Sequence, residues 1–314
     1  MDDVTVDKHA ELLANRVRKA HRKLRKAFER EGVGGYRLYD WDIPEVRAVV
    51  DRYEDHLVVG EYTRQQTEDV PDYPERLAAA VGEALGVPPE HLHARRRQTR
   101  PVAGDRYRRL GREGARIEVR ERALKFWVHL DDYLDTGLFN DHRDTRAMIG
   151  DQSDGARVLN LFGYTGTFTC WAAHGGAKRT VTVDTSGPYL QWARDNLRLN
   201  GLDDPRHETV KADVAEWIAS AEPGSFDLAI VDPPSFSTRF GARDFDVTRD
   251  HPELLARVHR LIAPGGRVLF STNHQRFEPR LDGLLYRAIE EITEQTVPRD
   301  YRNRTIHRAW ILRM

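Results

Sequence analysis

The sequence predicts an α/β fold built on a doubly wound parallel sheet. Short apolar runs alternate with helical segments from residue 157 to residue 271, the first run leads into a glycine turn, and three later runs end on an acid. Alternating strands and helices of this length are typical of parallel sheets. Because such sheets bind ligands beyond the carboxyl ends of their strands, we expect a site at that edge.

The first predicted strand covers residues 157–162, and the helix after its turn covers residues 167–174. Glycine has no Cβ, so Gly163 and Gly166 would let a flat ligand lie against the backbone. We expect the strand end and the turn to contact a cofactor through Asn160, Phe162, Gly163, Tyr164, Gly166 and Thr167.

The next predicted strands are residues 179–184, 210–213, 226–232 and 266–271, with a helix at 188–200. Asp184, Asp213 and Asp232 end three of them. A helix at 281–290 and final strands at 291–297 and 305–312 follow. This ending departs from the dinucleotide-binding pattern and matches the Rossmann-like, seven-stranded sheet of class I methyltransferases, whose last two strands are antiparallel.

Composition allows two domains and a sizeable core in 314 residues. The single cysteine, Cys170, excludes a disulfide framework and suits a reducing cytoplasm. No run reaches membrane-spanning length and no signal peptide is visible, so we expect a cytoplasmic protein without a membrane partner. The net charge of −1 hides two basic blocks, residues 16–30 and 95–125.

A basic N-terminal helix in 1–35 precedes two predicted domains, a small α+β RNA-binding domain in 36–130 and a methyltransferase domain in 131–314. The helix covers 7–30 with Asp7 as N-cap, and its apolar stripe is Leu13, Val17, Leu24 and Phe28. The small domain contains hairpins at 48–62 and 115–130, a helix at 74–85 and a strand at 92–97. RNA phosphates are expected to contact Arg18, Arg22, Arg25, Lys26, Arg100, Arg106, Arg108 and Arg109. A solvated helix face and an exposed arginine-rich loop are the alternatives.

Residues 133–143 link the two larger domains and mix Gly, Phe, Asp, His and Arg. We expect them to form a lid over the cofactor through Phe139, Asp141 and Arg143. The alternative is that Asp135 and Asp141 cap helices and that Phe139 belongs to the core.

The expected cofactor is S-adenosylmethionine, with S-adenosylhomocysteine as product. It needs a small turn, a carboxylate for the ribose and a polar group for adenine, which Gly163, Asp184 and Asp213 can supply. The spacing Gly163-x-x-Gly166 is not that of a pyrophosphate-binding turn. Helix capping is the alternative role for Asp184 and Asp213.

The most specific motif is Asp232-Pro233-Pro234-Ser235-Phe236. It follows a strand and offers a carboxylate, preorganised carbonyls and a ring that can stack on a base. We expect Asp232, Pro233, Pro234 and Phe236 to form the catalytic site. A Pro-Pro turn that only ends the strand is the alternative.

Carbon-5 methylation of a pyrimidine needs a cysteine nucleophile. The motif contains none, residues 270–273 contain none, and Cys170 is expected to pack in the core. A ring nitrogen or an exocyclic nitrogen is therefore the better acceptor. Asp232 suits guanine N7 and an exocyclic amine equally.

Five segments together resemble the C-terminal half of ribosomal large-subunit RNA methyltransferase K/L: residues 133–143, 160–167, 232–237, 245–251 and 303–307. The resemblance extends back to Asn15-Arg16 and to residues 36–40. It implies methylation of guanine N7 in 23S ribosomal RNA, with an acid or asparagine, here Asn160, ending the first strand. The family's N-terminal guanine-N2 module is missing, which puts the identity of the target guanine in doubt. A related cytosine-5 branch has a cysteine where this chain has Ser271-Thr272-Asn273.

The expected function is therefore RNA guanine-N7 methylation on an unpaired or extruded base, with 23S ribosomal RNA or a ribosomal precursor as partner and no metal. Methylation of an exocyclic amine, such as guanine N2, or of protein is the second reading. A non-catalytic RNA chaperone is the third.

Overall fold

The fold was analysed in a computed structural model that describes residues 1–97, 114, 116–133, 135–241 and 243–314. The chain divides into two compact units. Unit 1 contains residues 1–136 and 299–303, and unit 2 contains residues 137–298 and 304–314. Each unit has its own hydrophobic core.

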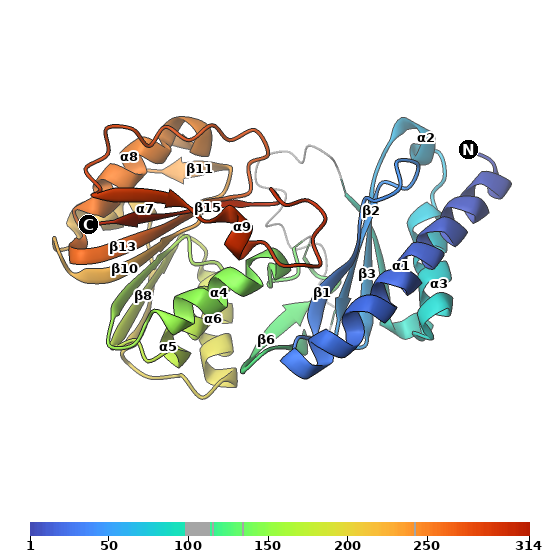
Figure 1. Cartoon of the computed structure of the whole chain (residues 1–314), viewed down its shortest axis with the longest axis horizontal. Helices are drawn as coiled ribbons and strands as arrows, with labels where there is room; N and C mark the ends of the chain where they lie inside the picture. The colour runs from blue at the N-terminus through green and yellow to red at the C-terminus, as the bar shows by residue number, and fades with distance from the viewer. Residues whose placement is uncertain (98–113, 115, 134, 242) are drawn as a thin grey trace. The chain divides into compact units, whose positions relative to one another are not determined.

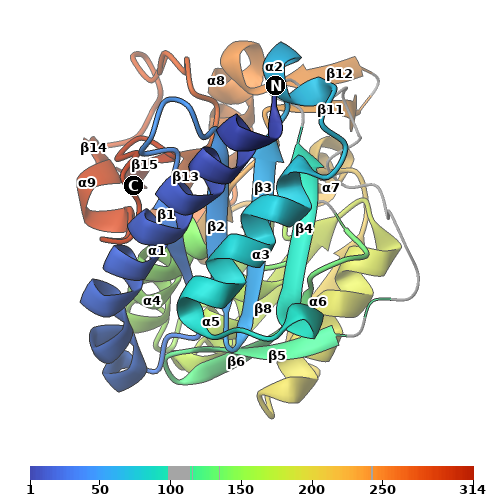
Figure 2. The same ribbon diagram turned by 90° about the vertical axis from the view of Figure 1, so that its right-hand side faces the viewer.

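Unit 1 is an α+β structure. Its elements are α1 (Asp3–Glu31), β1 (Gly35–Asp40), β2 (Ala48–Tyr53), β3 (His56–Tyr62), α2 (Gln65–Glu68), α3 (Tyr73–Leu85), η1 (Pro89–His91), β4 (Leu92–Arg97), β5 (Arg116–Glu121) and β6 (Leu124–His129). Among its described residues, strands pair in the order β1-β2-β3-β4, with only β3 and β4 parallel, and β5 pairs with β6. Figure 2 shows α1 and α3 side by side across one face of the β1–β4 sheet.

Helix α1 begins earlier than predicted. Asp2, not Asp7, is the N-cap and accepts a hydrogen bond from the Thr5 N–H, while Gly32 ends the helix with a φ of 70°. Leu13, Val17 and Phe28 are buried as predicted. Asp7 instead pairs with Arg76, 2.5 Å away.

A short return segment of the chain belongs to unit 1. The Arg37 N–H donates to Asp300 Oδ2 (2.8 Å) and the Asn303 N–H donates to Asp40 Oδ2 (3.0 Å). The Arg37 guanidinium lies over the Tyr301 ring and pairs with Asp51. Residues 299–303 are thus held to unit 1 by hydrogen bonds, by the contact of Arg37 with the Tyr301 ring and by the ion pair of Arg299 with Glu31.

Unit 2 contains the doubly wound sheet. Its elements are η3 (Asn140–His142), α4 (Arg143–Asp151), β7 (Arg157–Leu161), α5 (Thr167–His174), β8 (Arg179–Asp184), α6 (Gly187–Leu199), β9 (His207–Lys211), α7 (Val214–Ser220), β10 (Phe226–Val231), β11 (Phe236–Phe240), β12 (Arg243–Asp246), α8 (Val247–His259), β13 (Ile262–Thr272), β14 (Ala288–Glu291), α9 (Thr293–Thr296) and β15 (Arg308–Arg313).

Within the described residues, the sheet of unit 2 has seven strands in the order β14-β15-β13-β10-β7-β8-β9. The five strands from β13 to β9 are parallel, and β15 is antiparallel to both β13 and β14. The predicted class I methyltransferase sheet, with its final antiparallel pair, is confirmed. The strand order reverses between β7 and β10, and ligands of open α/β sheets bind at such a point.

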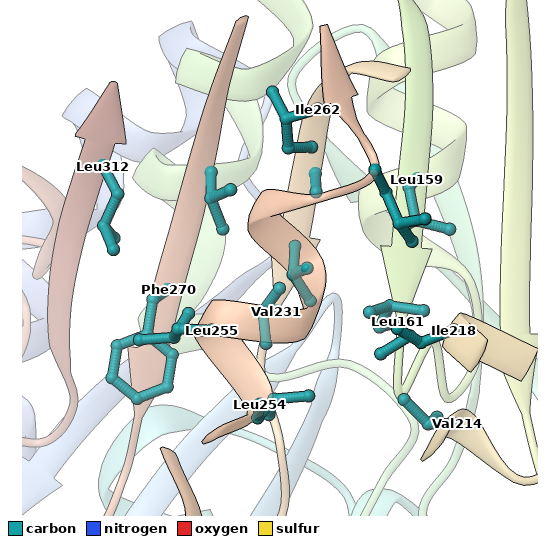
Figure 3. Packing of buried hydrophobic residues seen from close by; sticks show 14 of the residues in the cluster. Leu159, Leu161, Val214, Ile218, Val231, Leu254, Leu255, Ile262, Phe270 and Leu312 are labelled. Atoms are coloured by element: carbon teal, nitrogen blue, oxygen red, sulfur yellow. The ribbon is translucent and has the colours of Figure 1, made fainter. Parts of the chain in front are cut away.

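Helices cover both faces of this sheet (Figure 1). On one face, α7 and α8 contribute Val214, Ile218, Leu254 and Leu255, which pack against β7, β10 and β13. Figure 3 shows Leu254 and Leu255 of α8 lying among side chains from these strands. On the other face, α4 and α5 bury their own apolar residues. Each fully buried Leu or Phe contributes about 1.5–3 kcal/mol, so this packing fixes the strand ends that form the site.

The predicted end of the chain is partly wrong. No helix forms at 281–290: the chain turns at Gly283, whose φ is 82°, and residues 288–291 join the sheet as edge strand β14. The predicted strand 291–297 is instead the short helix α9. Residues 288–291 pair with β15 instead of continuing a helix, and Leu281 and Tyr286 are buried in the core of unit 2.

The observed units also differ from the predicted ranges. The basic helix packs into the core of unit 1, and residues 299–303 belong to unit 1 rather than to the C-terminal part. Among the helices of the described chain, none is long and apolar enough to cross a membrane.

Candidate functional site

The turn after β7 lies at the carboxyl edge of the sheet. Its backbone is left-handed at Phe162 (φ 57°), Tyr164 (φ 49°) and Gly166 (φ 70°). The Thr165 hydroxyl donates to the Gly137 carbonyl (2.7 Å), and the Asn196 amide donates to the Thr165 carbonyl (2.9 Å). The turn is therefore anchored to the linker on one side and to α6 on the other.

The two glycines of this turn serve packing. A Cβ on Gly163 would lie 2.3 Å from Thr182 Cγ2, and a Cβ on Gly166 would lie 2.6 Å from Ala193 Cβ. The predicted role of these glycines, room for a ligand on the backbone, stays a prediction. They let the turn press against β8 and α6, and Thr167 then begins α5.

Asn160 is buried inside the strand end. Its Nδ2 donates to Thr169 Oγ1 (2.9 Å), which in turn lies 2.6 Å from Thr182 Oγ1. These three side chains tie β7 to α5 and β8. Asn160 thus holds the turn in place, whether or not it also contacts a ligand.

Asp184 ends β8 and faces the same turn. Its Oδ2 accepts from the Tyr164 N–H (3.0 Å), and its Oδ1 accepts from the Ser186 N–H (2.8 Å). Burial raises the pKa of Asp184, and these two hydrogen bonds act in the opposite direction. Ser186, not Asp184, caps α6. Asp184 therefore has its carboxylate oriented by the turn.

Asp213 follows β9 and does cap a helix. Its Oδ1 accepts hydrogen bonds from the N–H groups of Ala215, Glu216 and Gly241. Capping, the predicted alternative, is therefore real for Asp213. Its Oδ2 makes no hydrogen bond to a described residue, so an adenine contact stays a prediction.

The linker packs against the turn. The Phe139 ring lies 5.4 Å from the Tyr164 ring, and the buried Arg146 donates to the Phe139 carbonyl (2.9 Å). Arg143 is also buried. Asn140, which sequence reasoning missed, is 3% exposed, and neither atom of its amide has a hydrogen-bond partner among the described residues.

Asp232 follows β10 and has a polar neighbour on each of two sides. The Ser271 hydroxyl at the end of β13 donates to Asp232 Oδ1 (2.7 Å), and His142 Nε2 lies 3.8 Å from Asp232 Oδ2. The His142 ring stacks on that of His307 with centroids 4.0 Å apart. His307 bonds through Nδ1 to Asp141 Oδ2 (3.1 Å) and through Nε2 to Thr296 Oγ1 (3.0 Å).

These contacts give Asp141 a structural partner that neither predicted role included. His307 lies so far along the chain that only the fold brings it to the linker.

Burial lowers the pKa of His142 to about 4, and the neighbouring His307 adds to the effect. The unfolded chain binds a proton at this histidine near pH 6.5, whereas the folded chain does not until about pH 4. Its contribution to stability is therefore complete above pH 6.5 and is lost as the pH falls toward 4. We expect His142→Gln to reduce the loss of unfolding free energy between pH 7 and pH 4 by up to about 3 kcal/mol.

Urea titrations at several pH values measure this difference. The exposed His174→Gln variant is the control and should keep the wild-type pH dependence. Identical slopes for wild type and His142→Gln would contradict the burial of a neutral imidazole.

The acceptor motif continues into the β11–β12 hairpin, whose Phe236 pairs with Asp246. Pro233 is buried, Pro234 is half-buried and Phe236 is 42% exposed. The exposed ring of Phe236 is thus separated from Asp232 by only three residues of the chain.

The predicted RNA-binding residues divide into two sets. Arg18, Arg22, Arg25 and Lys26 are all exposed on α1. The other four, Arg100, Arg106, Arg108 and Arg109, lie outside the described residues.

These observations fit a nucleoside cofactor bound to unit 2. Carboxylates stand at the carboxyl ends of β8, β9 and β10, the sheet edge where the turn after β7 also lies. The unpartnered Asn140 amide lies in the linker that packs on the turn. Asp184, Asp213 and Asn140 could hold the polar groups of such a molecule, with the rings of Phe139 and Tyr164 beside it.

The profile of the S-adenosylmethionine-dependent methyltransferases matches residues 75–297, more than half of the chain. Several solved structures are similar in fold. SMU.776, a proposed methyltransferase complexed with S-adenosylhomocysteine, is 20% identical with a TM-score of 0.75, over 97% of this chain and 82% of the other. A proposed SAM-dependent methyltransferase from Streptococcus mutans is 21% identical with a TM-score of 0.76, over 97% and 81%. The protein in a complex of aTrm5 and tRNALeu is 13% identical with a TM-score of 0.55, over 93% and 75%. The chain therefore belongs to the S-adenosylmethionine-dependent methyltransferases, and its cofactor is S-adenosylmethionine.

Proposed function

We propose that this enzyme methylates N7 of a guanine in 23S ribosomal RNA or a ribosomal precursor, on an unpaired or extruded base. The observation that carries the proposal is the acceptor motif: Asp232 is oriented by Ser271 and is followed by the exposed ring of Phe236. The resemblance to the C-terminal half of ribosomal large-subunit RNA methyltransferase K/L supports the choice of atom.

The cysteine of the chain argues against carbon methylation of a pyrimidine. Cys170, the single cysteine in the sequence, is fully buried in α5, and burial raises the pKa of its thiol. A neutral, inaccessible thiol cannot act as a nucleophile. Ser271 and Thr272, where a cytosine-5 enzyme would need its cysteine, are themselves buried in β13.

A nitrogen acceptor needs placement and charge stabilisation. S-adenosylmethionine supplies an electrophilic methyl group when bound. Guanine N7 has a free lone pair and becomes positively charged, so the protein has to orient the base and hold a carboxylate near it. Asp232 is such a carboxylate, and Ser271 restricts its rotation.

An exocyclic amine is the second candidate. An amine must lose a proton, and the Asp232 carboxylate could accept it. Methyl transfer to 23S ribosomal RNA followed by nucleoside mass spectrometry decides: 7-methylguanosine supports the first candidate and N2-methylguanosine the second. Methylated protein without methylated RNA would contradict both.

RNA as the substrate class has separate support in unit 1. The exposed residues Arg18, Arg22, Arg25 and Lys26 give α1 a basic face, and α1 is covered on its apolar side by the core of unit 1. One structural neighbour was solved with a transfer RNA. We propose that unit 1 binds RNA phosphates through this face.

Charge removal on α1 tests this role. We expect changing Arg18, Arg22, Arg25 and Lys26 together to Gln to lower RNA affinity and to flatten its dependence on salt by up to about 3 in the log–log slope, since each lost phosphate contact removes about 0.7. Filter binding at four salt concentrations gives the slope. Arg198→Gln with Arg206→Gln, which removes exposed arginines from unit 2, is the control. An unaltered slope in the α1 variant would show that this face is merely solvated and does not bind RNA.

The accessibility of N7 gives a further prediction. N7 lies in the major groove, which is too deep and narrow in A-form RNA for side chains to enter, so the base must be unpaired or extruded. We expect naked 23S ribosomal RNA to be methylated faster than a matched perfect duplex and faster than assembled subunits. If Phe236 stacks on the base, Phe236→Ala should lower kcat/KM by the equivalent of about 1–3 kcal/mol.

Leu285→Ala is the matched control, because Leu285 is an exposed apolar residue of unit 2. Equal rates on naked RNA and perfect duplex would refute base extrusion. A Phe236→Ala variant as active as the control would refute the stacking role of Phe236 but would leave base extrusion untouched.

A further inference from the structure

Three side chains of unit 1 converge at one end of its sheet. Asp55 lies in the β2–β3 turn, His56 begins β3 and His91 ends η1. His91 Nδ1 is 3.2 Å from Asp55 Oδ2, and His56 Nε2 is 3.6 Å from Asp55 Oδ1. One ligand atom from each of the three lies within 4.8 Å of the others.

The fold explains this convergence. Strands β3 and β4 are parallel neighbours, with Leu57 opposite Leu92, so the residues just before them meet. The β2–β3 turn is two residues long, and Glu54 takes a left-handed φ of 55°, which brings Asp55 to the same end. The backbone thus fixes all three positions.

The ring of His56 is also oriented by His93, on the side away from Asp55. Its Nδ1 lies 3.0 Å from His93 Nε2, and His93 Nδ1 lies 2.6 Å from Asp131 Oδ1. A carboxylate that orients a histidine, which then leaves its other nitrogen to a ligand, is the usual arrangement around a bound metal. This relay leaves His56 Nε2 directed toward Asp55.

His91 has a ring nitrogen without a hydrogen-bond partner among the described residues. Its Nδ1 is buried and, despite the short distance to Asp55, makes no hydrogen bond to any residue that the structure describes. A cation between this nitrogen, His56 Nε2 and the Asp55 carboxylate would satisfy all three. Two imidazoles and a carboxylate are ligands that suit Zn²⁺ and similar divalent ions.

We propose that Asp55, His56 and His91 bind a divalent transition-metal ion of the zinc class, with the fourth position left to water or a substrate oxygen. This site replaces the expectation that the chain binds no metal, and it is independent of the methyl transfer in unit 2. The other described group with this composition, Asp141, His142 and His307, is a poorer site, because both nitrogens of His307 are already bonded.

The test uses the full-length protein without a histidine tag, stripped with EDTA and titrated with ZnCl₂ in a calorimeter. We expect saturable binding of one ion per chain, and CoCl₂ should give the intense visible bands of a four-coordinate site. Removing a ligand in His56→Ala or His91→Ala should weaken Zn²⁺ binding by more than about 100-fold, and His93→Ala by about 10–100-fold.

His174→Ala, an exposed histidine of unit 2, should leave the affinity unchanged. Circular dichroism checks the folding of each variant, and if a histidine variant does not fold, Asp55→Asn in the exposed turn should still weaken binding at least about 10-fold. Absence of binding to the wild type, or an affinity unaltered by both the ligand variants and Asp55→Asn, would overturn the proposal.

Discussion

Replacing Asp232 by Ala should lower kcat by about 10²–10⁴-fold, the range for losing a positioned acid–base or charge-stabilising group. The carboxylate accepts a hydrogen bond from Ser271 and has His142 on its other side. Affinity for S-adenosylmethionine should change much less. Single-turnover methyl transfer measures the first quantity and calorimetry the second.

Asp232→Asn separates charge from shape, because it keeps an acceptor for Ser271 without the negative charge. If the charge stabilises the cationic product, the Asn variant should be nearly as slow as the Ala variant. Full turnover in either variant, with the fold intact, would remove Asp232 from the chemistry.

Asp184→Ala should weaken S-adenosylmethionine binding by about 1.5–3 kcal/mol, which is the scale of a hydrogen bond to a charged group and about 10–150-fold in Kd. Part of the loss should come through the turn, because Asp184 also accepts from the N–H groups of Tyr164 and Ser186. Calorimetry gives the affinity directly.

Glu208→Ala is the control, since Glu208 is an exposed carboxylate on the adjacent β9. Asp184→Asn should retain the hydrogen bond from Tyr164 or from Ser186 but not both. Its affinity for S-adenosylmethionine should therefore lie between that of the wild type and that of Asp184→Ala. An Asp184→Ala variant with wild-type affinity would show that the ribose contact lies elsewhere.

The sheet could be predicted from the sequence because its strands are apolar runs bounded by glycines and acids. Arg179–Asp184, for example, is a strand with the predicted bounds. The helix predicted at 281–290 was wrong because strand β15 offers its edge to residues 288–291. Periodicity within one segment carries no information about a partner strand elsewhere in the chain.

Residues of the candidate site could be proposed from the sequence only where they end strands. Asp184 and Asp232 follow that pattern, whereas Asp141 and His307 are 166 residues apart and meet only in the folded unit. The glycines of the turn stood out in the sequence, but the close approach of Thr182 and Ala193 that their missing side chains accommodate did not. No motif in the sequence marks Asn140. It stands out only in the structure, where its amide is buried without a hydrogen-bond partner among the described residues.

Because residues 299–303 belong to unit 1, no single continuous stretch of the gene encodes either unit. The chain passes between them after Thr136, after Pro298 and again after Asn303. A gene fragment that stops at residue 136 would encode Arg37 and Asp40 without the Asp300 and Asn303 that complete their hydrogen bonds. A single recombination crossover could therefore not transfer either unit intact, because each unit is encoded by two separate stretches of the gene.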